Sequence, residues 1–475
     1  MANVLFIQKT YLEMFGVMSI AAVLKNRGHI VRVSLERGPR LTAQALEFRP
    51  DVIGFSMVSM NVHANMRDAA LLRQALPPAP IVFGGVHPTF FPEIVEEPCV
   101  DAVCRGEGEY AMAEFVEERA AGRTGEHVAN LWVKANGHVR RNPPREPIRD
   151  IDQLPFHDRS VYYDHYPFLK NNPVKNFLLS RGCPFQCSFC FNQPYREVYR
   201  ECGHTVPQRR RSPQSAVAEI VDFAAHWPLE KIAFQDENFC LDKAWLYEFL
   251  YLYKSRVGRP FFCMVNAFLA DEEIIIALKN AGCYHTTFGL ESGDETLRRD
   301  VLRKKATDAQ IRETSRLLHK HNITFHTTNI FCFPGETVHS AIKTLRLNAD
   351  IRPESAVAFN YMPFANLPLT NQAITQGWLT DSAAHDWERL PRTVVRIPNW
   401  RRIRRIKLMF GAGVRIPALI PAIVFLSILP MGPAFNLVSK FIEALDYFSR
   451  NRQNIPYMIK NFFQLRRLYK SYFYE

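Results

Sequence analysis

The sequence has few cysteines, and their number does not suit an extracellular protein. Ten Cys among 475 residues are too sparse for a disulfide scaffold. The first residues lack a basic segment followed by a long apolar run, so we expect no signal peptide. Both absences predict a protein of the reducing cytoplasm, where thiolates and oxygen-sensitive clusters survive.

The first 400 residues have almost no net charge. The chain has a formal net charge of +12, from 59 Lys and Arg against 47 Asp and Glu. Residues 401–475 hold 13 Lys and Arg but 3 Asp and Glu, so +10 of that charge lies there. A nearly neutral body argues against nucleic acid as a partner.

The sequence also lacks an uninterrupted membrane span. Residues 416–439 contain no charge, but Pro417, Pro421, Pro430 and Pro433 divide this run, and a span needs about 20 residues. Residues 371–475 therefore read either as a helical region lying peripherally on the inner face of a membrane or as a helical cap with a solvated basic face. Basic and aromatic residues flank the run: Arg401, Arg402, Arg404, Arg405 and Lys407 before it, and Tyr457, Phe462, Phe463, Arg466, Arg467, Tyr469, Lys470, Tyr472 and Phe473 after it.

What the sequence does contain is a cluster of three thiols, Cys183, Cys187 and Cys190, in the order C-x3-C-x2-C. No fourth Cys follows at a regular distance, so an iron–sulfur cluster here would keep one iron open to an outside ligand. Zinc is the competing interpretation, with Cys202 and His204 as further ligands. An apolar run, 177–180, precedes the thiols and places them at the C-terminal end of a strand, where parallel α/β folds build active sites.

With Phe189 before the last Cys, this loop resembles that of radical S-adenosylmethionine (SAM) enzymes. The resemblance implies that the three thiolates hold a [4Fe-4S] cluster whose open iron binds SAM. It also implies that an electron from an external flavodoxin- or ferredoxin-type donor cleaves SAM to a 5′-deoxyadenosyl radical.

Residues 176–370 alternate six apolar strands with helical stretches, as in the partial (β/α)6 barrel of that family. Polar motifs follow three of these strands, and each is also ordinary helix punctuation when taken alone. Taken together they resemble the family's SAM-binding segments, which implies SAM contacts from Phe189 and from Asp236, Glu237, Asn238, Glu291, Ser292, Pro334 and Gly335.

Residues 1–125 also alternate strands and helices, which predicts a doubly wound, Rossmann-like sheet. Ahead of a radical SAM loop, this pattern resembles the cobalamin (B12)-binding-domain-containing radical SAM enzymes. The D-x-H-x-x-G signature is absent after the first strand, so cobalamin would bind without a His ligand from that loop. The alternative is a cobalamin-like fold that binds no cofactor. The residues implied in cobalamin binding stand at strand ends: Ser56, Gly84, Gly85, His87, Glu107 and Gly108.

Residues 126–175 are expected to link the two domains. Asn136-Gly137 between two apolar-polar runs is a type I′ hairpin signal. The following stretch contains Pro143, Pro144, Pro147 and Pro155, which argue against helix or central strand.

Cobalamin beside a radical source implies methylation of an unactivated carbon. The basic, apolar C-terminal region favours a small hydrophobic substrate, with isoprenoid or hopanoid-like lipids ahead of tetrapyrroles. A radical SAM cyclase or oxidoreductase acting on a lipid or tetrapyrrole is the first alternative. A soluble antibiotic precursor as substrate and a non-catalytic, metal-stabilised binding module also remain open.

Overall fold

The computed structural model describes residues 1–386 and 394–429, so the residues from Tyr457 to Phe473 named above lie outside the described part. The described chain forms two compact units. One contains Met1–Asn172 and Pro194–Arg211, and the other contains Pro173–Gln193 and the residues from Ser212 onward. Residues 126–172, expected to be a linker, thus group with the first 125 residues.

The first unit is built on a seven-stranded sheet in the order β2-β1-β3-β4-β5-β6-β7. The first five strands are parallel, as the strand–helix alternation predicts, and the Asn136-Gly137 turn forms the expected hairpin, which extends the sheet in antiparallel fashion. The bounds are β1 Asn3–Gln8, β2 Ile30–Ser34, β3 Val52–Ser56, β4 Ile81–Gly84, β5 Ala102–Cys104, β6 Leu131–Ala135 and β7 His138–Arg141.

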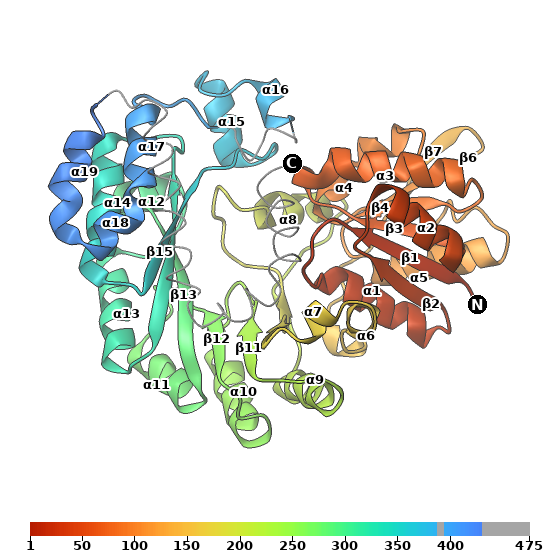
Figure 1. The fold of residues 1–475 in the computed structure, drawn as a ribbon, viewed down its shortest axis with the longest axis horizontal. Coiled ribbons are helices and arrows are strands. Elements are labelled where there is room, and N and C mark those ends of the chain that lie inside the picture. Colours follow the sequence, from red (N-terminus) through yellow and green to blue (C-terminus); the bar gives the residue numbers. More distant parts are fainter. Residues whose placement is uncertain (387–393, 430–475) are drawn as a thin grey trace. The chain divides into compact units, whose positions relative to one another are not determined.

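Helices cover both faces of this sheet (Figure 1). Helix α1 (Phe15–Asn26) packs on α5 (Glu109–Ala120), and α2 (Gly38–Phe48) packs on α3 (Val62–Ala75). This two-sided cover explains why the parallel strands are apolar on both faces. Shorter elements complete the unit: η1 Ser59–Asn61, α4 Val86–Phe90, η2 Pro92–Glu96, η3 Ile151–Gln153, α6 Ser160–Tyr163, α7 Pro167–Lys170 and β10 Arg209–Arg210.

The second unit contains a parallel six-stranded sheet in the order β15-β14-β13-β12-β11-β8. All five neighbouring pairs are parallel, which agrees with the expected open (β/α)6 barrel. The bounds are β8 Val174–Phe177, β11 Lys231–Phe234, β12 Phe261–Met264, β13 Cys283–Glu291, β14 Thr324–Phe331 and β15 Ser355–Asn360, with the two-residue strand β9 at Ser180–Arg181.

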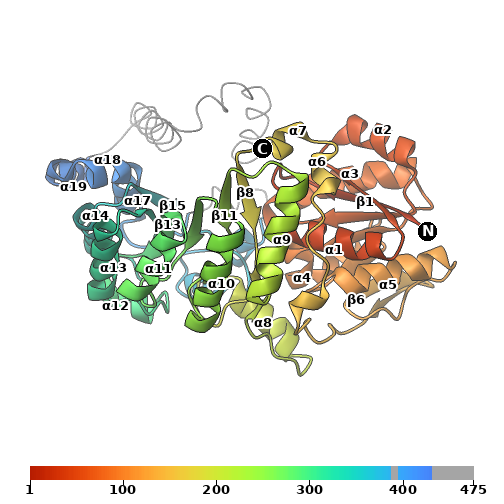
Figure 2. The ribbon, with the colours of Figure 1, turned by 90° about the horizontal axis from the view of Figure 1, so that it is seen from below.

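Helices line the outer side of this sheet (Figures 1 and 2). Phe234, Phe261 and Phe288 are buried beneath them, with at most 1% of each residue exposed. Side-chain caps begin several of the helices: Asp271, for example, accepts a hydrogen bond from the Ile274 backbone N–H. The bounds are α9 Pro213–His226, α10 Lys243–Arg256, α11 Glu272–Asn280, α12 Glu295–Asp300, α13 Asp308–Lys320 and α14 Val338–Ile351. Helix α8 (Asn192–Arg200) begins in this unit, but its residues from Pro194 onward belong to the first unit.

The described part of the C-terminal region is helical, as expected. Helices α17 and α18 pack on α14 and β15, which agrees with a cap on the barrel. The described part of the apolar run forms η5 and the seven-residue α19, and no helix among the described residues is long and apolar enough to cross a membrane. The bounds are α15 Pro368–Thr375, α16 Asp381–Ala384, α17 Trp400–Leu408, α18 Phe410–Arg415, η5 Pro417–Leu419 and α19 Ile420–Leu426.

Candidate active site

The three thiols lie in the loop between β9 and α8, and none of them forms a disulfide. Ser188, between the second and third Cys, fixes this loop. Its N–H donates to the Leu302 carbonyl at 3.2 Å, its hydroxyl donates to the Val301 carbonyl at 2.6 Å, and its carbonyl accepts from the Leu369 N–H at 3.3 Å. The thiols are therefore half-exposed side chains on an anchored loop.

Amide donors point at two of the thiols. Asn238 Nδ2 lies 3.0 Å from Cys183 Sγ, and Asn192 Nδ2 lies 3.6 Å from Cys190 Sγ. Burial raises the pKa of the Cys187 thiol to about 11, and the positive charge of Lys304 opposes this shift. Donors of this kind stabilise thiolates, the form in which Cys binds a metal.

A [4Fe-4S] cluster fits this donor set. Within residues 1–386 and 394–429, no three His, Cys, Asp or Glu side chains gather around one ion position. A cluster does not need such a gathering, because each of its thiolates binds a different iron. Cys202 and His204, the candidate additional zinc ligands, belong to the other compact unit.

The three polar residues after β11 have different surroundings. Asp236 is 2% exposed and accepts hydrogen bonds from the Leu179 N–H at 3.1 Å and the Ser180 hydroxyl at 2.5 Å. Glu237 is exposed and accepts from Asn192 Nδ2 at 3.1 Å. Asn238 faces Cys183. The assignment of these three residues to SAM stays a prediction.

Glu291 ends β13, and Ser292 follows it in a constrained turn. Glu291 has a φ of 65°, and Lys304 Nζ lies 3.2 Å from its carboxylate. A Cβ at Gly289 would overlap both side chains, so the glycine leaves room for this ion pair. Sequence reasoning missed Lys304, because nothing in its local pattern separates it from a surface lysine.

Arg298 is a second residue that sequence reasoning missed. Its side chain is fully buried, and its guanidinium donates to the carbonyls of Ser292 and Ala306 and to the Asp308 carboxylate. Since Leu302, in the segment between these contacts, also accepts from Ser188, Arg298 fixes both the Ser292 turn and the support of the thiol loop.

The remaining predicted SAM residues lie where the motifs placed them. Pro334 is buried, Phe189 is half-buried, and Gly335 has a φ of 85° that favours glycine. In the same turn, burial raises the pKa of Glu336 well above its usual value.

The side of the six-stranded sheet that faces away from the helices, here called the inner face, carries apolar side chains beside polar ones. Register places Phe262 beside His285, Met264 beside Thr287, and Ile330 beside Phe359. Paired residues of parallel strands share a face, and this face is partly exposed, with Phe359 at 55%.

A hydrogen-bonded chain of two histidines crosses the beginning of this face. The Thr324 hydroxyl donates to the Tyr284 carbonyl, so His285 Nδ1 donates to Thr324 at 2.7 Å and His285 Nε2 accepts from His326 Nδ1 at 2.8 Å. His326 Nε2 then accepts from the Thr287 hydroxyl at 2.8 Å. Burial lowers the pKa of His285 to about 4, which keeps it neutral at pH 7.

In the first unit, the predicted cobalamin residues Ser56 and Gly84 are register partners at the ends of β3 and β4. Gly85 has a φ of 101°, and a Cβ there would lie 2.7 Å from the Met57 carbonyl, so only glycine fits. His87 is 2% exposed, and its Nδ1 lies 3.1 Å from Ser59 Oγ. Backbone and small side chains thus form this edge of the sheet, as a close approach to a bulky ligand requires.

Glu107 and Gly108 have structural partners. The Glu107 carboxylate accepts from Arg209 Nη1 at 2.7 Å and from the Ile148 N–H at 2.8 Å. A Cβ at Gly108 would lie 2.9 Å from Ile20 Cδ1, so this glycine permits the close packing of α5 on α1. Their assignment to cobalamin stays a prediction.

The loop after β1, where the His signature is absent, is held by contacts within itself and with α3. Gln8 Nε2 donates to the carbonyls of Thr10 at 2.6 Å and Leu12 at 2.7 Å, and Lys9 forms a buried ion pair with Asp68. No imidazole occurs in this loop, which suits cobalamin binding without a His ligand from it.

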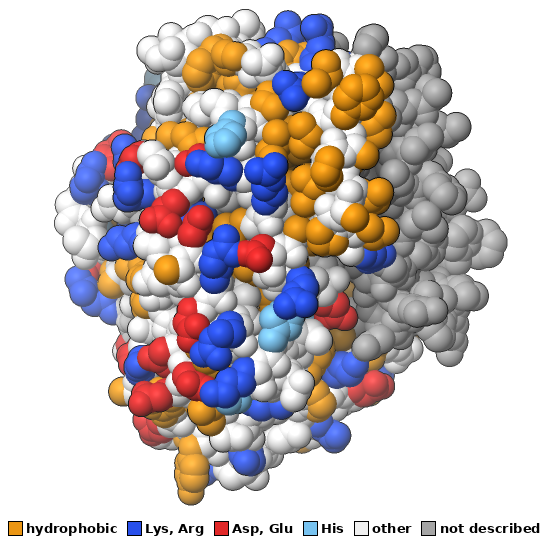
Figure 3. Space-filling model, turned by 90° about the vertical axis from the view of Figure 1, so that its left-hand side faces the viewer, with side chains coloured by type: hydrophobic (Ala, Val, Ile, Leu, Met, Phe, Trp, Pro, Cys, Tyr) orange, Lys and Arg blue, Asp and Glu red, His pale blue; other side chains and the backbone are white. Residues whose placement is uncertain are grey.

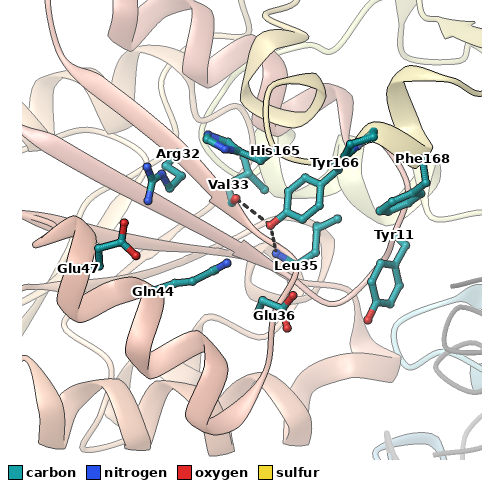
Figure 4. A pocket seen from close by; sticks show the side chains of 11 residues that line it. Tyr11, Arg32, Val33, Leu35, Glu36, Gln44, Glu47, His165, Tyr166 and Phe168 are labelled. Atoms are coloured by element: carbon teal, nitrogen blue, oxygen red, sulfur yellow. Dashed lines mark hydrogen bonds between the residues drawn. The ribbon is translucent and has the colours of Figure 1, made fainter.

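A cavity of about 460 Å³ lies along β2 and α7 rather than at the ends of β3 and β4. Figure 4 shows Tyr166 between them: its hydroxyl accepts from the Leu35 N–H at 3.0 Å and donates to the Val33 carbonyl at 3.2 Å. Tyr166 therefore provides hydrogen-bond partners for backbone groups at edge strand β2. The cavity is separate from the predicted cobalamin residues.

Two family models match the chain. The B12 binding domain matches residues 9–116, and the Radical SAM superfamily matches residues 177–347. The matches coincide with the doubly wound sheet and with the barrel that holds the thiol loop.

Curated relatives include methyltransferases and a cyclase. An uncharacterized methyltransferase of Pyrococcus horikoshii is 27% identical over 343 residues, covering 70% of this chain and 71% of its own. The anaerobic magnesium-protoporphyrin IX monomethyl ester cyclase of Rubrivivax gelatinosus is 26% identical over 66% of this chain, but the match spans only 57% of the cyclase. The hopanoid C-3 methylase of Methylococcus capsulatus is 28% identical over 45% of this chain and 43% of its own.

Solved structures share the fold. The radical SAM methyltransferase TsrM of Kitasatospora setae, with cobalamin and a [4Fe-4S] cluster bound, has a TM-score of 0.66 at 17% identity and covers 79% of this chain and 78% of its own. OxsB with aqua-cobalamin bound has a TM-score of 0.69 at 15% identity, covering 94% of this chain and 72% of its own.

Proposed function

Since the chain belongs to the cobalamin (B12)-binding-domain-containing radical SAM enzymes, we propose that it methylates an unactivated carbon of a hydrophobic, lipid or isoprenoid-like substrate. Its cofactors are a [4Fe-4S] cluster, SAM and cobalamin. The methyltransferases among its relatives support the reaction class.

The observation that carries the substrate class is the inner face of the barrel. Apolar side chains from β12, β14 and β15 are partly exposed there, with His285 and Thr287 of β13 between them, and this face leads toward Gly289 and Glu291 at the end of β13. Exposed apolar surface that leads to a reaction site is what an apolar substrate requires. The apolar residues are Phe262, Met264, Ile330, Val357 and Phe359.

Different residues of the chain have different roles in the proposed reaction. Cys183, Cys187 and Cys190 hold the cluster, Glu237 receives the SAM ammonium, and the turn fixed by Arg298 positions Ser292. Together the bound groups supply a 5′-deoxyadenosyl radical and a transferable methyl group, with electrons from a flavodoxin- or ferredoxin-type donor. The apolar inner face excludes water from the substrate carbon.

A radical SAM cyclase acting on a tetrapyrrole is the second candidate, because the cyclase of Rubrivivax gelatinosus matches two thirds of this chain. The two candidates differ in their products. Methyl transfer adds one methyl group from SAM, whereas oxidative cyclisation adds none.

One experiment tests both the methyltransferase and the cyclase candidate. It uses anaerobically reconstituted enzyme with cobalamin, a strong reductant and SAM that carries a deuterated methyl group. We expect fractionated isoprenoid or hopanoid lipids to gain the labelled methyl group by mass spectrometry. A cyclised tetrapyrrole without label would favour the cyclase, and stoichiometric zinc with no SAM cleavage would favour a binding module.

A further inference from the structure

The helices that end the described chain are part of the barrel. Ile403 and Ile406 of α17 are fully buried, and the Phe410 ring of α18 lies 5.3 Å from the Phe331 ring of β14. A Cβ at Gly413 would come within 2.9 Å of Leu345, so α18 lies directly against α14. The sides of α17 and α18 that face the barrel therefore belong to its hydrophobic core.

Their outward side is apolar as well. Within α19, only Ile420 and Ile423 are buried, although every residue of this helix is apolar. A helix that is hydrophobic all round belongs in a protein core or in lipid. Figure 3 shows the resulting continuous apolar surface. We call it the outer patch, and its exposed residues are Ile416 (50%), Leu419 (40%), Phe425 (62%), Leu426 (37%), Ile428 (59%) and Leu429 (40%).

The charges of the segment that forms the outer patch all have one sign. Residues 394–429 contain no Asp or Glu. Arg402 and Arg405 donate to Ser427 at the end of α19, while Arg401, Arg404 and Arg415 are exposed. An apolar surface whose own segment carries only basic charges complements the anionic headgroups and acyl chains of a lipid leaflet. The basic residues are Arg396, Arg401, Arg402, Arg404, Arg405, Lys407 and Arg415.

We propose that the outer patch docks the enzyme onto an anionic lipid surface. The seven-residue α19 is too short to span, so it lies at the boundary between headgroups and acyl chains, with the exposed arginines on lipid phosphates. This docking rests on the proposed hydrophobic substrate, which it would bring within reach of the barrel.

Vesicle flotation of the full-length protein tests the proposal. We expect it to float with vesicles of mixed phosphatidylcholine and phosphatidylglycerol, less with phosphatidylcholine alone, and less at high salt. The double variant Phe425→Glu/Ile428→Glu should reduce the bound fraction at least about tenfold, because burial of each large apolar side chain favours binding by about 1.5–3 kcal/mol. The matched control is Tyr251→Glu on α10, where Tyr251 is 75% exposed, and it should float like the wild type.

Deleting the chain after Asn399 is not an adequate test, because it would uncover Phe331 and Leu345 and destabilise the barrel. Equal flotation of the double variant, or wild-type protein that stays with the soluble fraction, would overturn the proposal. A concentration-dependent dimer that the double variant abolishes without lipid would assign the patch to a second copy instead. Vesicle binding needs no turnover, so docking without a methylated lipid would refute the proposed substrate but not the surface.

Discussion

The two units prepare their sites in different ways. The barrel presents side chains with defined chemistry: three thiols, two amide donors, an exposed carboxylate and a lysine. The N-terminal unit presents backbone, because Gly85 allows a turn that no other residue fits and the polar side chains of the β1 loop are engaged in hydrogen bonds and ion pairs. The barrel site should therefore fail when a functional group is removed, and the N-terminal site when a side chain is added.

The largest expected effect is the loss of a thiol from the barrel. Cys187→Ser should abolish the cluster and reduce 5′-deoxyadenosine formation more than about 100-fold, since even ligand-supporting residues cost 10–100-fold. Iron content and product assay measure this, while cobalamin binding should persist. Cys202→Ser is the control and should keep both the cluster and the formation of 5′-deoxyadenosine. If Cys202 proves as necessary as Cys187, a zinc site replaces the cluster.

The next effect tests whether the barrel site depends on its buried support. Arg298→Met leaves the Asp308 carboxylate and two carbonyls without their donor, which should lower the free energy of unfolding by about 3–5 kcal/mol. Chemical denaturation measures it. The neighbouring Arg299, 62% exposed and paired with Asp300, is the matched control, and Arg299→Met should leave the free energy of unfolding nearly unchanged, because solvent screens this ion pair. Equal losses of unfolding free energy in both variants would show that Arg298 does not hold the Ser292 turn and the support of the thiol loop.

The converse test adds a side chain to the N-terminal unit. Gly85→Ala should abolish cobalamin binding, because the new Cβ meets the Met57 carbonyl and displaces the turn. Gly122 also has a positive φ, of 74°, but nothing lies within 4 Å of its Cβ position. Gly122→Ala therefore isolates the backbone strain of about 1–2 kcal/mol and should leave corrinoid titration unchanged. Retained binding in Gly85→Ala would remove this turn from the cobalamin site.

The same difference explains what the sequence predicts. The strands, the hairpin at Asn136-Gly137 and the thiol loop follow from local patterns, because apolar periodicity, turn residues and Cys spacing are local properties. The side-chain hydrogen bonds of Arg298 and Lys304 span 6 to 13 residues, and the His285–His326 contact spans 41 residues, so none of them follows from the spacing within one helix or strand. The place of residues 126–172 was also beyond prediction, because a hairpin signal does not say which sheet edge it joins.

A smaller effect, common to both units, is pH dependence. Burial lowers the pKa of His87 in the N-terminal unit and of His285 in the barrel to about 4. The unfolded chain binds these protons near pH 6.5, so stability should decrease as pH falls from about 6.5 to 4, by up to about 1.4 kcal/mol per pH unit for each histidine. His285→Gln should flatten this slope, whereas His226→Gln, at an exposed site, should not. An unchanged slope in His285→Gln would contradict its buried neutral state.

The smallest expected effect separates the two amide donors at the thiols. The hydrogen bond from Asn238 Nδ2 to Cys183 is 3.0 Å long, and that from Asn192 to Cys190 is 3.6 Å long. Donors stabilise the more negative, reduced cluster, so Asn238→Ala should lower its reduction potential. About 1.4 kcal/mol corresponds to 59 mV for one electron, and the loss of one such bond should not exceed about that value. Asn192→Ala should cause a smaller shift, because the longer bond is weaker, although this variant also removes the donor to Glu237. Potentiometric titration followed by electron paramagnetic resonance measures both shifts. If Asn192→Ala lowers the reduction potential as much as Asn238→Ala, the lengths of these two N–H···S hydrogen bonds do not determine the reduction potential of the cluster.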